Sequence, residues 1–459
     1  MIMKKQLLSL YIVALCAMGL VACNDFDNPS VPYEDGPEAP VAVTPPTIEA
    51  DWNLELMPNE GTQDANVFVY KDKKYDAMFT RTLGWNGGDG VLTTALPDGN
   101  IYWTFNDSFY GVVDGPTRTR YSSKSSFPRN SIMILTGEQS AETLVWLNEF
   151  VQTENPDAER YYQARTHIRH PYATLSDEAI QRGDIDQDFV YWAGDATVYE
   201  DPARGNVLQM LWTGVDLTQG NGAMINIDGI VREYSLEGTP GDGTYMSVLN
   251  NGNTKTISDG YGYGSTMFED KEEGHIYLYT TKQEHLLCRV LVARTATLDL
   301  TSEWSYYIRN VNGEYEWQTT VPTEEEQIRS YICTYSGSMP WVIEKDGTYY
   351  MFMEGFPFGR DVYMYRSETP YGPFVDQKLL FTLPATLDKL GNPYHQRWYM
   401  INLHPALSRT GELVFSTNSD PVTFWDNFDR VGSADFYRPY FFRVFNWENA
   451  YSEDLLSIS

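Results

Sequence analysis

The sequence predicts an all-β protein, and a five-bladed β-propeller accounts best for its internal repeats. Aromatic residues make up 14% of the 459 residues, alongside 35 Gly and 24 Pro, a mixture typical of many short strands joined by turns. Apolar and polar side chains alternate in segments such as 101–105, and no segment keeps a helical period of 3.6 residues. A β-sandwich array or a two-domain β protein is the alternative fold.

A strand–turn–strand pattern recurs five times along the chain. The turn glycines of the five copies are Gly99, Gly205, Gly274, Gly347 and Gly411. A lone hairpin is only marginally stable in water, so these units are expected to stack radially as five blades, which leaves few exposed strand edges. The longest interval leaves room for an insertion around residues 149–187. Segment 66–79, interpreted as two strands, is expected to close the ring beside the C-terminal strands.

The first residues predict export and a lipid anchor. A short apolar stretch follows two lysines and ends in Leu-Val-Ala-Cys at residues 20–23, which is the order of a secretory signal. This junction resembles the bacterial lipobox, which implies cleavage before Cys23 and lipidation of its thiol; an ordinary signal peptide is the alternative. We therefore expect a signal peptide at 1–22, a lipidated disordered tether at 23–50 and a propeller domain at 51–459.

The segment that follows Cys23 bears on localisation. It is rich in proline and acidic residues, so it buries little apolar surface and is expected to stay extended. An acidic run directly after a lipidated cysteine resembles the surface-export signal of Bacteroidetes lipoproteins. The resemblance implies an outer-membrane lipoprotein exposed at the cell surface, and an anchor facing the periplasm is the alternative.

Charge and cysteine content narrow the partners. The formal net charge of −30 disfavours nucleic acid, whose phosphates it would repel, and carries no penalty for neutral sugars. Neither a cofactor nor a metal ion is expected, because no histidines except His167 and His170 have zinc spacing and the acidic triplet within 184–188 lacks the Gly and Glu of a calcium loop. Cys288 and Cys333 either form a disulfide or remain two buried thiols.

Two aspartates are the candidate catalytic residues. In a propeller, the residue that opens the inner strand of a blade and the residue that closes its hairpin partner both face the central pocket. Asp89 lies in a glycine-flanked bend before the first hairpin, and Asp107 follows its second strand. Two carboxylates at one pocket mouth are what glycoside hydrolysis needs, one as acid and one as base or nucleophile. The alternative is that such residues only cap turns.

Further residues at the predicted pocket mouth are candidates for binding substrate. Carboxylates and polar side chains could tune the acid pair or bind sugar hydroxyls, and aromatic rings could stack on sugar faces. A structural ion pair, a rim charge or core packing is the alternative for each. These candidates are Asp195, Arg129, Asn130, Tyr263, Ser265, Glu354, His404 and Trp85.

Short motifs resemble a known family. They are Gly88-Asp89-Gly90, Asn106-Asp107-Ser108-Phe109, Tyr263-Gly264-Ser265 and His404-Pro405-Ala406-Leu407-Ser408. They resemble the five-bladed family once catalogued as domain of unknown function 4185, which includes endo-acting D-arabinanases, and more closely the Bacteroidetes family catalogued as domain of unknown function 5005. The resemblance implies Asp89 and Asp107 as the catalytic pair. The chain departs from the first family by having Asn106 and Ser108 where Gly and Thr are usual, which puts the substrate in doubt.

The sequence as a whole therefore predicts a glycoside hydrolase at the cell surface. Its expected substrate is a polysaccharide or oligosaccharide, arabinan-like by resemblance, and inversion is the expected stereochemical course. The membrane is its second expected partner, through the N-terminal lipid. The alternative is a surface lipoprotein that binds glycan without cleaving it, since a fold by itself does not define a function.

Overall fold

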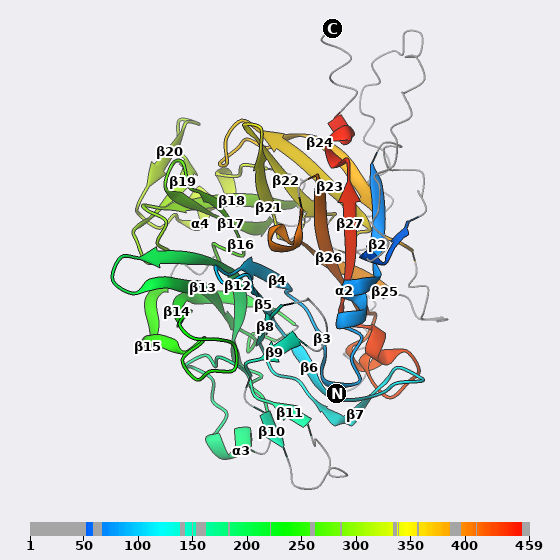
Figure 1. Ribbon diagram of the computed structural model, residues 1–459. Coiled ribbons are helices and arrows are strands. Elements are labelled where there is room, and N and C mark those ends of the chain that lie inside the picture. The colour runs from blue at the N-terminus through cyan, green and yellow to red at the C-terminus, as the bar shows by residue number, and fades with distance from the viewer. Residues whose placement is uncertain are drawn as a thin grey trace, which may run out of the picture. The chain divides into compact units, whose positions relative to one another are not determined.

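The chain is described here by a computed structural model (Figure 1). The described residues are 52–57, 67–137, 143–148, 150–152, 162–181, 184–220, 222–257, 262–284, 287–333, 337, 339–355, 358–385, 396–409 and 411–451. Within these ranges the protein is all-β, with only short helices. None of the described helices is long and apolar enough to cross a membrane. The predicted signal peptide and tether, including Cys23, lie outside the described residues.

Four antiparallel sheets each come from one stretch of chain (Figure 1). In order, their strands are β4 (Leu92–Ala95), β5 (Ile101–Phe105), β8 (Ser131–Leu135) and β9 (Leu144–Trp146) in the first sheet; β12 (Phe189–Asp201), β13 (Gly205–Asp216), β14 (Ile225–Ser235) and β15 (Val248–Ile257) in the second; β16 (Thr266–Asp270), β17 (His275–Glu284), β18 (Leu287–Thr295), β19 (Trp304–Arg309) and β20 (Tyr315–Gln318) in the third; and β21 (Trp341–Lys345), β22 (Thr348–Glu354), β23 (Asp361–Ser367) and β24 (Val375–Thr382) in the fourth.

The fifth large sheet joins the two ends of the described chain. Its order is β1-β2-β27-β26-β25, with β1 (Leu54–Leu56), β2 (Phe68–Asp72), β25 (Gln396–Leu403), β26 (Glu412–Pro421) and β27 (Pro439–Phe445). The pairing of β2 with β27 brings Phe68 opposite Phe445. The expectation that the segment around residue 68 pairs with the C-terminal strands is therefore confirmed.

Successive sheets contact one another through their first strands. Contacts join β4 to β12, β12 to β16 and β16 to β21, and β22 of the fourth sheet contacts β25 of the fifth. The circuit closes where η3 (Pro405–Leu407), just after β25, contacts β4. The five sheets thus form a closed series of neighbours.

Buried polar side chains form one hydrogen bond across each of these junctions, and we call this set the inter-sheet bonds. They join Asn106 Oδ1 to the Ala193 N–H (2.6 Å), Asp195 Oδ2 to the Met267 N–H (2.9 Å), Thr266 Oγ1 to the Pro340 carbonyl (2.5 Å), Glu354 Oε2 to the Ile401 N–H (3.0 Å) and His404 Nδ1 to Thr93 Oγ1 (2.9 Å). Four of these bonds satisfy a backbone N–H or C=O group buried between sheets, and the fifth pairs two buried side chains, so that each polar group has a partner.

Smaller elements flank the large sheets. A three-stranded sheet has the order β3-β6-β7, with β3 (Leu83–Gly88), β6 (Ser108–Asp114) and β7 (Thr119–Ser126). The region of the predicted insertion contains β10 (Phe150–Gln152) paired with β11 (Tyr162–Ala164), followed by α3 (Asp177–Gln181). The remaining helices are α4 (Glu324–Arg329), η4 (Phe424–Asn427), η5 (Ser433–Asp435) and η6 (Trp447–Tyr451).

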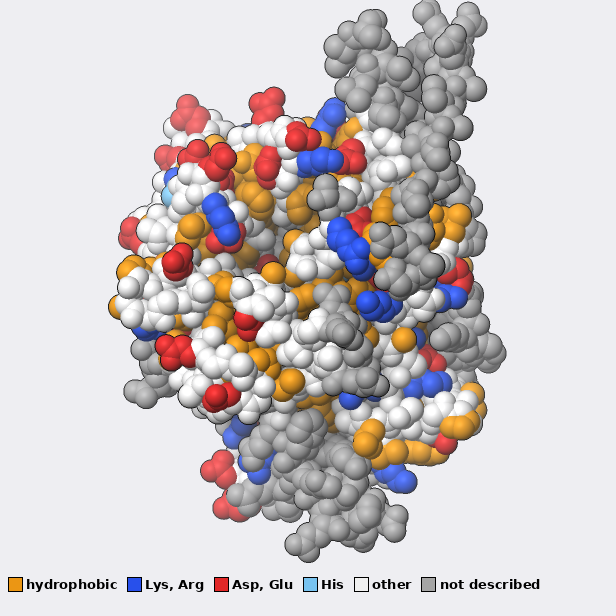
Figure 2. All heavy atoms as spheres, viewed as in Figure 1, with side chains coloured by type: hydrophobic (Ala, Val, Ile, Leu, Met, Phe, Trp, Pro, Cys, Tyr) orange, Lys and Arg blue, Asp and Glu red, His pale blue; other side chains and the backbone are white. Residues whose placement is uncertain are grey.

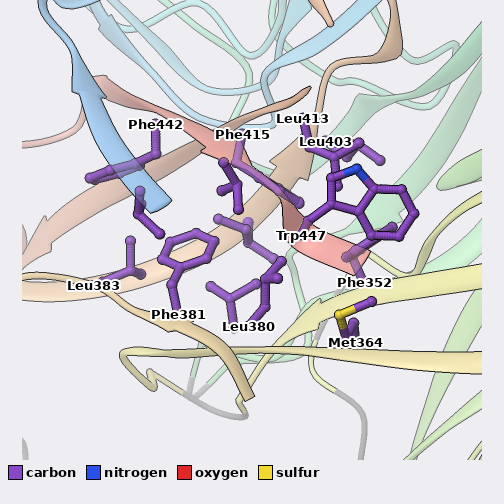
Figure 3. Packing of buried hydrophobic residues seen from close by; sticks show 14 of the residues in the cluster. Phe352, Met364, Leu380, Phe381, Leu383, Leu403, Leu413, Phe415, Phe442 and Trp447 are labelled. Atoms are coloured by element: carbon purple, nitrogen blue, oxygen red, sulfur yellow. The ribbon is translucent and has the colours of Figure 1, made fainter. Parts of the chain in front are cut away.

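Aromatic and aliphatic side chains fill the spaces between sheets. Figure 3 shows one such cluster between the fourth and fifth sheets, where Phe352 of β22 faces Phe415 of β26. Their ring centroids lie 5.6 Å apart, and both side chains are fully buried. Burial of each ring stabilises the fold by about 1.5–3 kcal/mol, so this packing holds neighbouring sheets together.

Two details of the predicted strands are wrong. Residues 75–79, predicted as a strand, instead lie in helix α2 (Lys73–Met78) and at its C-cap, because the Asp72 carboxylate accepts hydrogen bonds from the backbone N–H groups of Lys74 and Tyr75 and so caps the helix. In the fifth repeat, the segment from Pro405 forms η3, and the strand that pairs with β26 is β25, upstream of the motif.

Candidate functional site

The two candidate catalytic aspartates lie at one bend of a long hairpin. β3 pairs with β6, β4 pairs with β5, and the chain changes sheets between these pairs at Asp89 and at Asp107. The Asp89 N–H donates to the Asp107 carbonyl (3.3 Å), so the two residues lie opposite each other. Gly90 has φ +59°, and a Cβ there would collide with the Asn106 amide. Only glycine therefore fits the bend next to Asp89.

The Asp89 carboxylate is held by two tyrosines of the fifth sheet region. Its Oδ2 accepts hydrogen bonds from the hydroxyls of Tyr437 (2.9 Å) and Tyr399 (3.0 Å). Its Oδ1 is buried and has no hydrogen-bond partner among the residues that the structure describes. Burial, followed by the negative charge of Asp107, raises the pKa of Asp89 to about 8. Asp89 therefore keeps its proton at neutral pH, and Oδ1 is the oxygen free to carry it.

The Asp107 carboxylate has a different environment. Arg129 Nη1 lies 3.1 Å from its Oδ2 and the Trp192 indole N–H donates to its Oδ1 at 3.4 Å. The Asp107 side chain is 13% exposed. Burial raises the pKa of Asp107, whereas the charge of Arg129 acts in the opposite direction. Because Asp107 has a cation beside it and Asp89 has only neutral donors, Asp107 is the first of the two to ionise.

A buried arginine connects the segments that carry Asp89 and its tyrosine partner. Arg120 of β7 is fully buried and donates to Asn86 through both Nε–Oδ1 (2.7 Å) and Nη2–O (3.0 Å). The same guanidinium donates to the carbonyls of Asn427 (3.2 Å), Ser433 (3.3 Å) and Phe436 (3.2 Å), the last of which precedes Tyr437. With its five N–H groups engaged, Arg120 sets the spacing between Asp89 and Tyr437.

Three of the predicted binding residues form inter-sheet bonds. Asp195 accepts from two backbone N–H groups, Glu354 accepts from Ile401, and His404 lies between Thr93 and Ser416. Burial raises the pKa of Asp195 to about 7 and that of Glu354 to about 8, and it lowers the pKa of His404 to about 3. The hydrogen bonds that the structure shows for these three side chains are therefore made to other groups of the same chain.

The other predicted binding residues divide between the site and the core. Arg129 lies at the site, against Asp107. Asn130 is fully buried and bonds the backbone of Ile168 through both ends of its amide, and Ser265 donates to the Tyr279 carbonyl. Trp85 (0% exposed) and Tyr263 (6%) are packed in aromatic clusters. Because neither ring has an open face, the prediction that they stack on sugars is wrong.

Sequence reasoning missed the side chains that distinguish the two carboxylates. Tyr399, Tyr437, Arg120 and Trp192 are not among the residues that the sequence singles out. Both tyrosines lie more than 300 positions from Asp89 in the sequence. No local sequence pattern marks either tyrosine. In the structure, Tyr437 is distinguished by its left-handed φ of +60°, which is costly outside glycine and occurs often at functional sites.

A cleft of about 540 Å³ lies beside Arg129. It is lined by Ser125, Ser126, Phe127, Thr174, Leu175, Asp184, Ile185, Gln187 and Asp188. Arg129 connects it to the acid pair, because its Nε donates to the carbonyl of Asp186 at 2.6 Å while its Nη1 contacts Asp107.

Among the residues that the structure describes, no group of three or more His, Cys, Asp or Glu side chains is arranged to hold a metal ion. Cys288 and Cys333 are buried thiols.

Fold and site together define a class of all-β protein whose sheets follow one another in a closed series and whose acid pair lies at a strand bend. The family model described as "Domain of unknown function (DUF5005)" matches residues 72–447, and the chain belongs to this family. A candidate hydrolase from Bacteroides ovatus ATCC 8483, known from its crystal structure, is 56% identical over 90% of this chain and 98% of that chain, with a TM-score of 0.83.

More distant similarities concern glycoside hydrolases of family GH43. A GH43_1 enzyme from Xanthomonas citri, complexed with xylotriose, is 12% identical over 81% of this chain and 92% of that chain, with a TM-score of 0.39. The GH43 protein BlXynB from Bacillus licheniformis is 14% identical over 77% of this chain and 51% of its own, with a TM-score of 0.37. No protein with a curated description matches the chain.

Proposed function

We propose that the protein is a glycoside hydrolase that acts on a neutral polysaccharide. The observation that carries this proposal is the pair of neighbouring aspartates in unlike surroundings: Asp89 is bound by two neutral hydroxyls and has a pKa of about 8, whereas Asp107, whose pKa burial also raises, has the Arg129 cation beside it and ionises first. Pairs of this kind mark the acid and the base of a hydrolase. The description of the Bacteroides ovatus relative as a candidate hydrolase supports the same reaction class.

The geometry suggests how each carboxyl group acts. The proton on the Asp89 carboxyl group is transferred to the glycosidic oxygen as the bond to the anomeric carbon breaks. The Asp107 carboxylate takes a proton from the water that attacks the same carbon from the opposite face, so the products are two sugars with free hydroxyls. The tyrosines bind Asp89 from the fifth sheet region, whereas Arg129 and Trp192 bind Asp107 from the other side. Inversion requires the two carboxyl groups to lie far enough apart to leave room for this water molecule.

The test is hydrolysis of a panel of soluble polysaccharides that includes arabinan, xylan and β-1,3-galactan. Reducing ends are measured first, and proton NMR of the earliest product then gives its anomeric configuration. We expect cleavage of at least one polymer and a product of inverted configuration. A retained configuration would contradict the roles assigned to the pair, and binding without cleavage would favour the alternative of a glycan-binding protein.

We further propose that the five large sheets are the five blades of one β-propeller. The closed series of strand contacts and the inter-sheet bonds support this arrangement, as does the joining of both chain ends in the fifth sheet. An experimental structure of the protein is expected to show five sheets around one axis with Asp89 and Asp107 at its mouth. A sixth blade, or two sheets packed face to face, would contradict the proposal.

We also propose that the mature protein is a lipoprotein of the outer membrane exposed at the cell surface, anchored through Cys23. The Leu-Val-Ala-Cys junction and the acidic segment after it support this proposal. In a bacterial host that processes lipoproteins, the wild-type protein should partition with membranes and become accessible to external protease, whereas a Cys23→Ser variant should be soluble, because it lacks the acyl chains. A wild-type protein found wholly soluble would contradict the anchor.

A further inference from the structure

A cluster of exposed apolar side chains lies on the loop between β26 and β27. Val422 (54% exposed), Phe424 (45%), Trp425 (71%) and Val431 (67%) all belong to this loop, and we call them the apolar shelf. In Figure 2, apolar side chains gather at the lower right of the molecule, where Figure 1 places β7 and the segment that leads to β27. Apolar side chains that are exposed together often mark a binding site, whereas single exposed apolar residues are common on any protein surface.

The loop that carries the apolar shelf is firmly held. Its backbone pairs with β7, through the Asp429 N–H to the Arg120 carbonyl (2.8 Å) and the Gly432 N–H to the Thr117 carbonyl (2.9 Å). The Asp429 carboxylate in turn accepts from the Ser122 N–H (3.1 Å). The exposed rings therefore sit on an ordered backbone, which lowers the entropy that the loop would lose on binding a ligand.

Aromatic rings connect the apolar shelf to the acid pair. Phe424 lies 5.6 Å from Trp425 and 5.5 Å from Phe127, measured between ring centroids. Phe127 lies 6.0 Å from Tyr437, whose hydroxyl donates to Asp89. Phe127 is also part of the cleft beside Arg129. The apolar shelf is thus linked to Asp89 by ring contacts through Phe127, which is partly buried, and Tyr437, which is buried.

We propose that the apolar shelf is a distal subsite that binds a neutral polysaccharide chain extending from the acid pair. This inference rests on the proposed function. The C–H face of a sugar ring is apolar and its rim is polar, which matches a Trp425 ring presented at the surface. Asp426 and Arg430 beside the shelf pair with each other at 2.6 Å, and the net charge of the chain is −30, so an uncharged polymer suits this surface better than an anionic one.

The experiment compares Trp425→Ala with Tyr315→Ala, which removes an exposed aromatic ring from β20 in the third sheet. Binding to arabinan, xylan and β-1,3-galactan is measured by affinity electrophoresis in an Asp89→Asn background, so that no polymer is cleaved. Loss of one stacking ring is expected to weaken binding of the recognised polymer about tenfold, whereas Tyr315→Ala leaves it unchanged. In the active protein, Trp425→Ala should raise KM for the polymer and leave cleavage of a trisaccharide unchanged.

Other outcomes separate the inference from the proposed function. If the wild-type protein cleaves a polymer and Trp425→Ala binds it normally, the apolar shelf is not a subsite, while the hydrolase proposal stands. If Trp425→Ala instead abolishes self-association in sedimentation, or attachment to lipid vesicles, with glycan binding unchanged, the shelf belongs to a second copy or a membrane surface and the inference is wrong. If no polymer is bound or cleaved, both proposals fail.

Discussion

Replacing Asp89 with asparagine is expected to lower the turnover of the recognised polysaccharide by about 10²–10⁴-fold. Asparagine keeps the shape of the side chain and can still accept the tyrosine hydrogen bonds at Oδ, but it has no proton to give the leaving oxygen. Binding should survive, because the amide keeps the packing of the site. Turnover and affinity are measured separately, by initial rates and by affinity electrophoresis. Full activity in Asp89→Asn would remove Asp89 from the mechanism.

The same mechanism determines the pH dependence. Activity requires Asp89 protonated and Asp107 ionised, so the rate should fall at alkaline pH as Asp89 loses its proton near pH 8. The acid limb belongs to Asp107, whose pKa burial raises and the charge of Arg129 partly brings back down. In the Arg129→Gln variant, the acid limb should move to higher pH, so that the pH range in which the enzyme is active becomes narrower. Because the two groups interact, each limb reports the pair as a whole. An acid limb that does not move would contradict the role of Arg129.

The sequence indicated most of the sheet structure because strand signals are local. Alternation and turn glycines identified the first two strands of four sheets, where Gly99, Gly205, Gly274 and Gly347 all take a left-handed φ in the turn. It missed the sheet β3-β6-β7, because the β7 segment Thr119–Ser126 is polar and largely exposed at its centre. That strand is held by the loop before β27, a contact between residues about 310 positions apart that no local pattern encodes.

The candidate site was predictable only in part, for a related reason. A glycine-flanked bend marks Asp89, and the end of the next strand marks Asp107, so both could be named from local sequence. What differentiates their pKa values comes from elsewhere: Tyr399 and Tyr437 from the fifth sheet region and Trp192 from the second sheet. Conversely, Glu354 and Asp195 looked like pocket carboxylates because strand ends converge there. Whether such a residue faces a ligand or a neighbouring backbone depends on how the sheets pack.

The inter-sheet role of Glu354 gives the second large expected effect, on stability. Burial raises the pKa of Glu354 from 4.5 to about 8, so between these two values the folded protein keeps a proton that the unfolded chain releases. The unfolded state then binds fewer protons, and the free energy of unfolding falls as pH rises from about 4.5 to 8. Glutamine removes this titration and keeps an oxygen for the Ile401 N–H. Glu354→Gln should therefore match wild type near pH 5 and be more stable by a few kcal/mol at pH 8.5.

Chemical unfolding at the two pH values measures this difference, with Glu368→Gln as the matched control, because that glutamate is exposed just after β23 in the same sheet. Glu354→Ala should be destabilised at both pH values, since it leaves the buried Ile401 N–H without a partner. Hydrolysis near pH 6 distinguishes the structural role from a catalytic one: Glu354→Gln should keep wild-type turnover there. A fall of 10²-fold or more, with stability at pH 8.5 unchanged, would show that Glu354 transfers a proton to substrate and that Asp89 does not act alone as the acid.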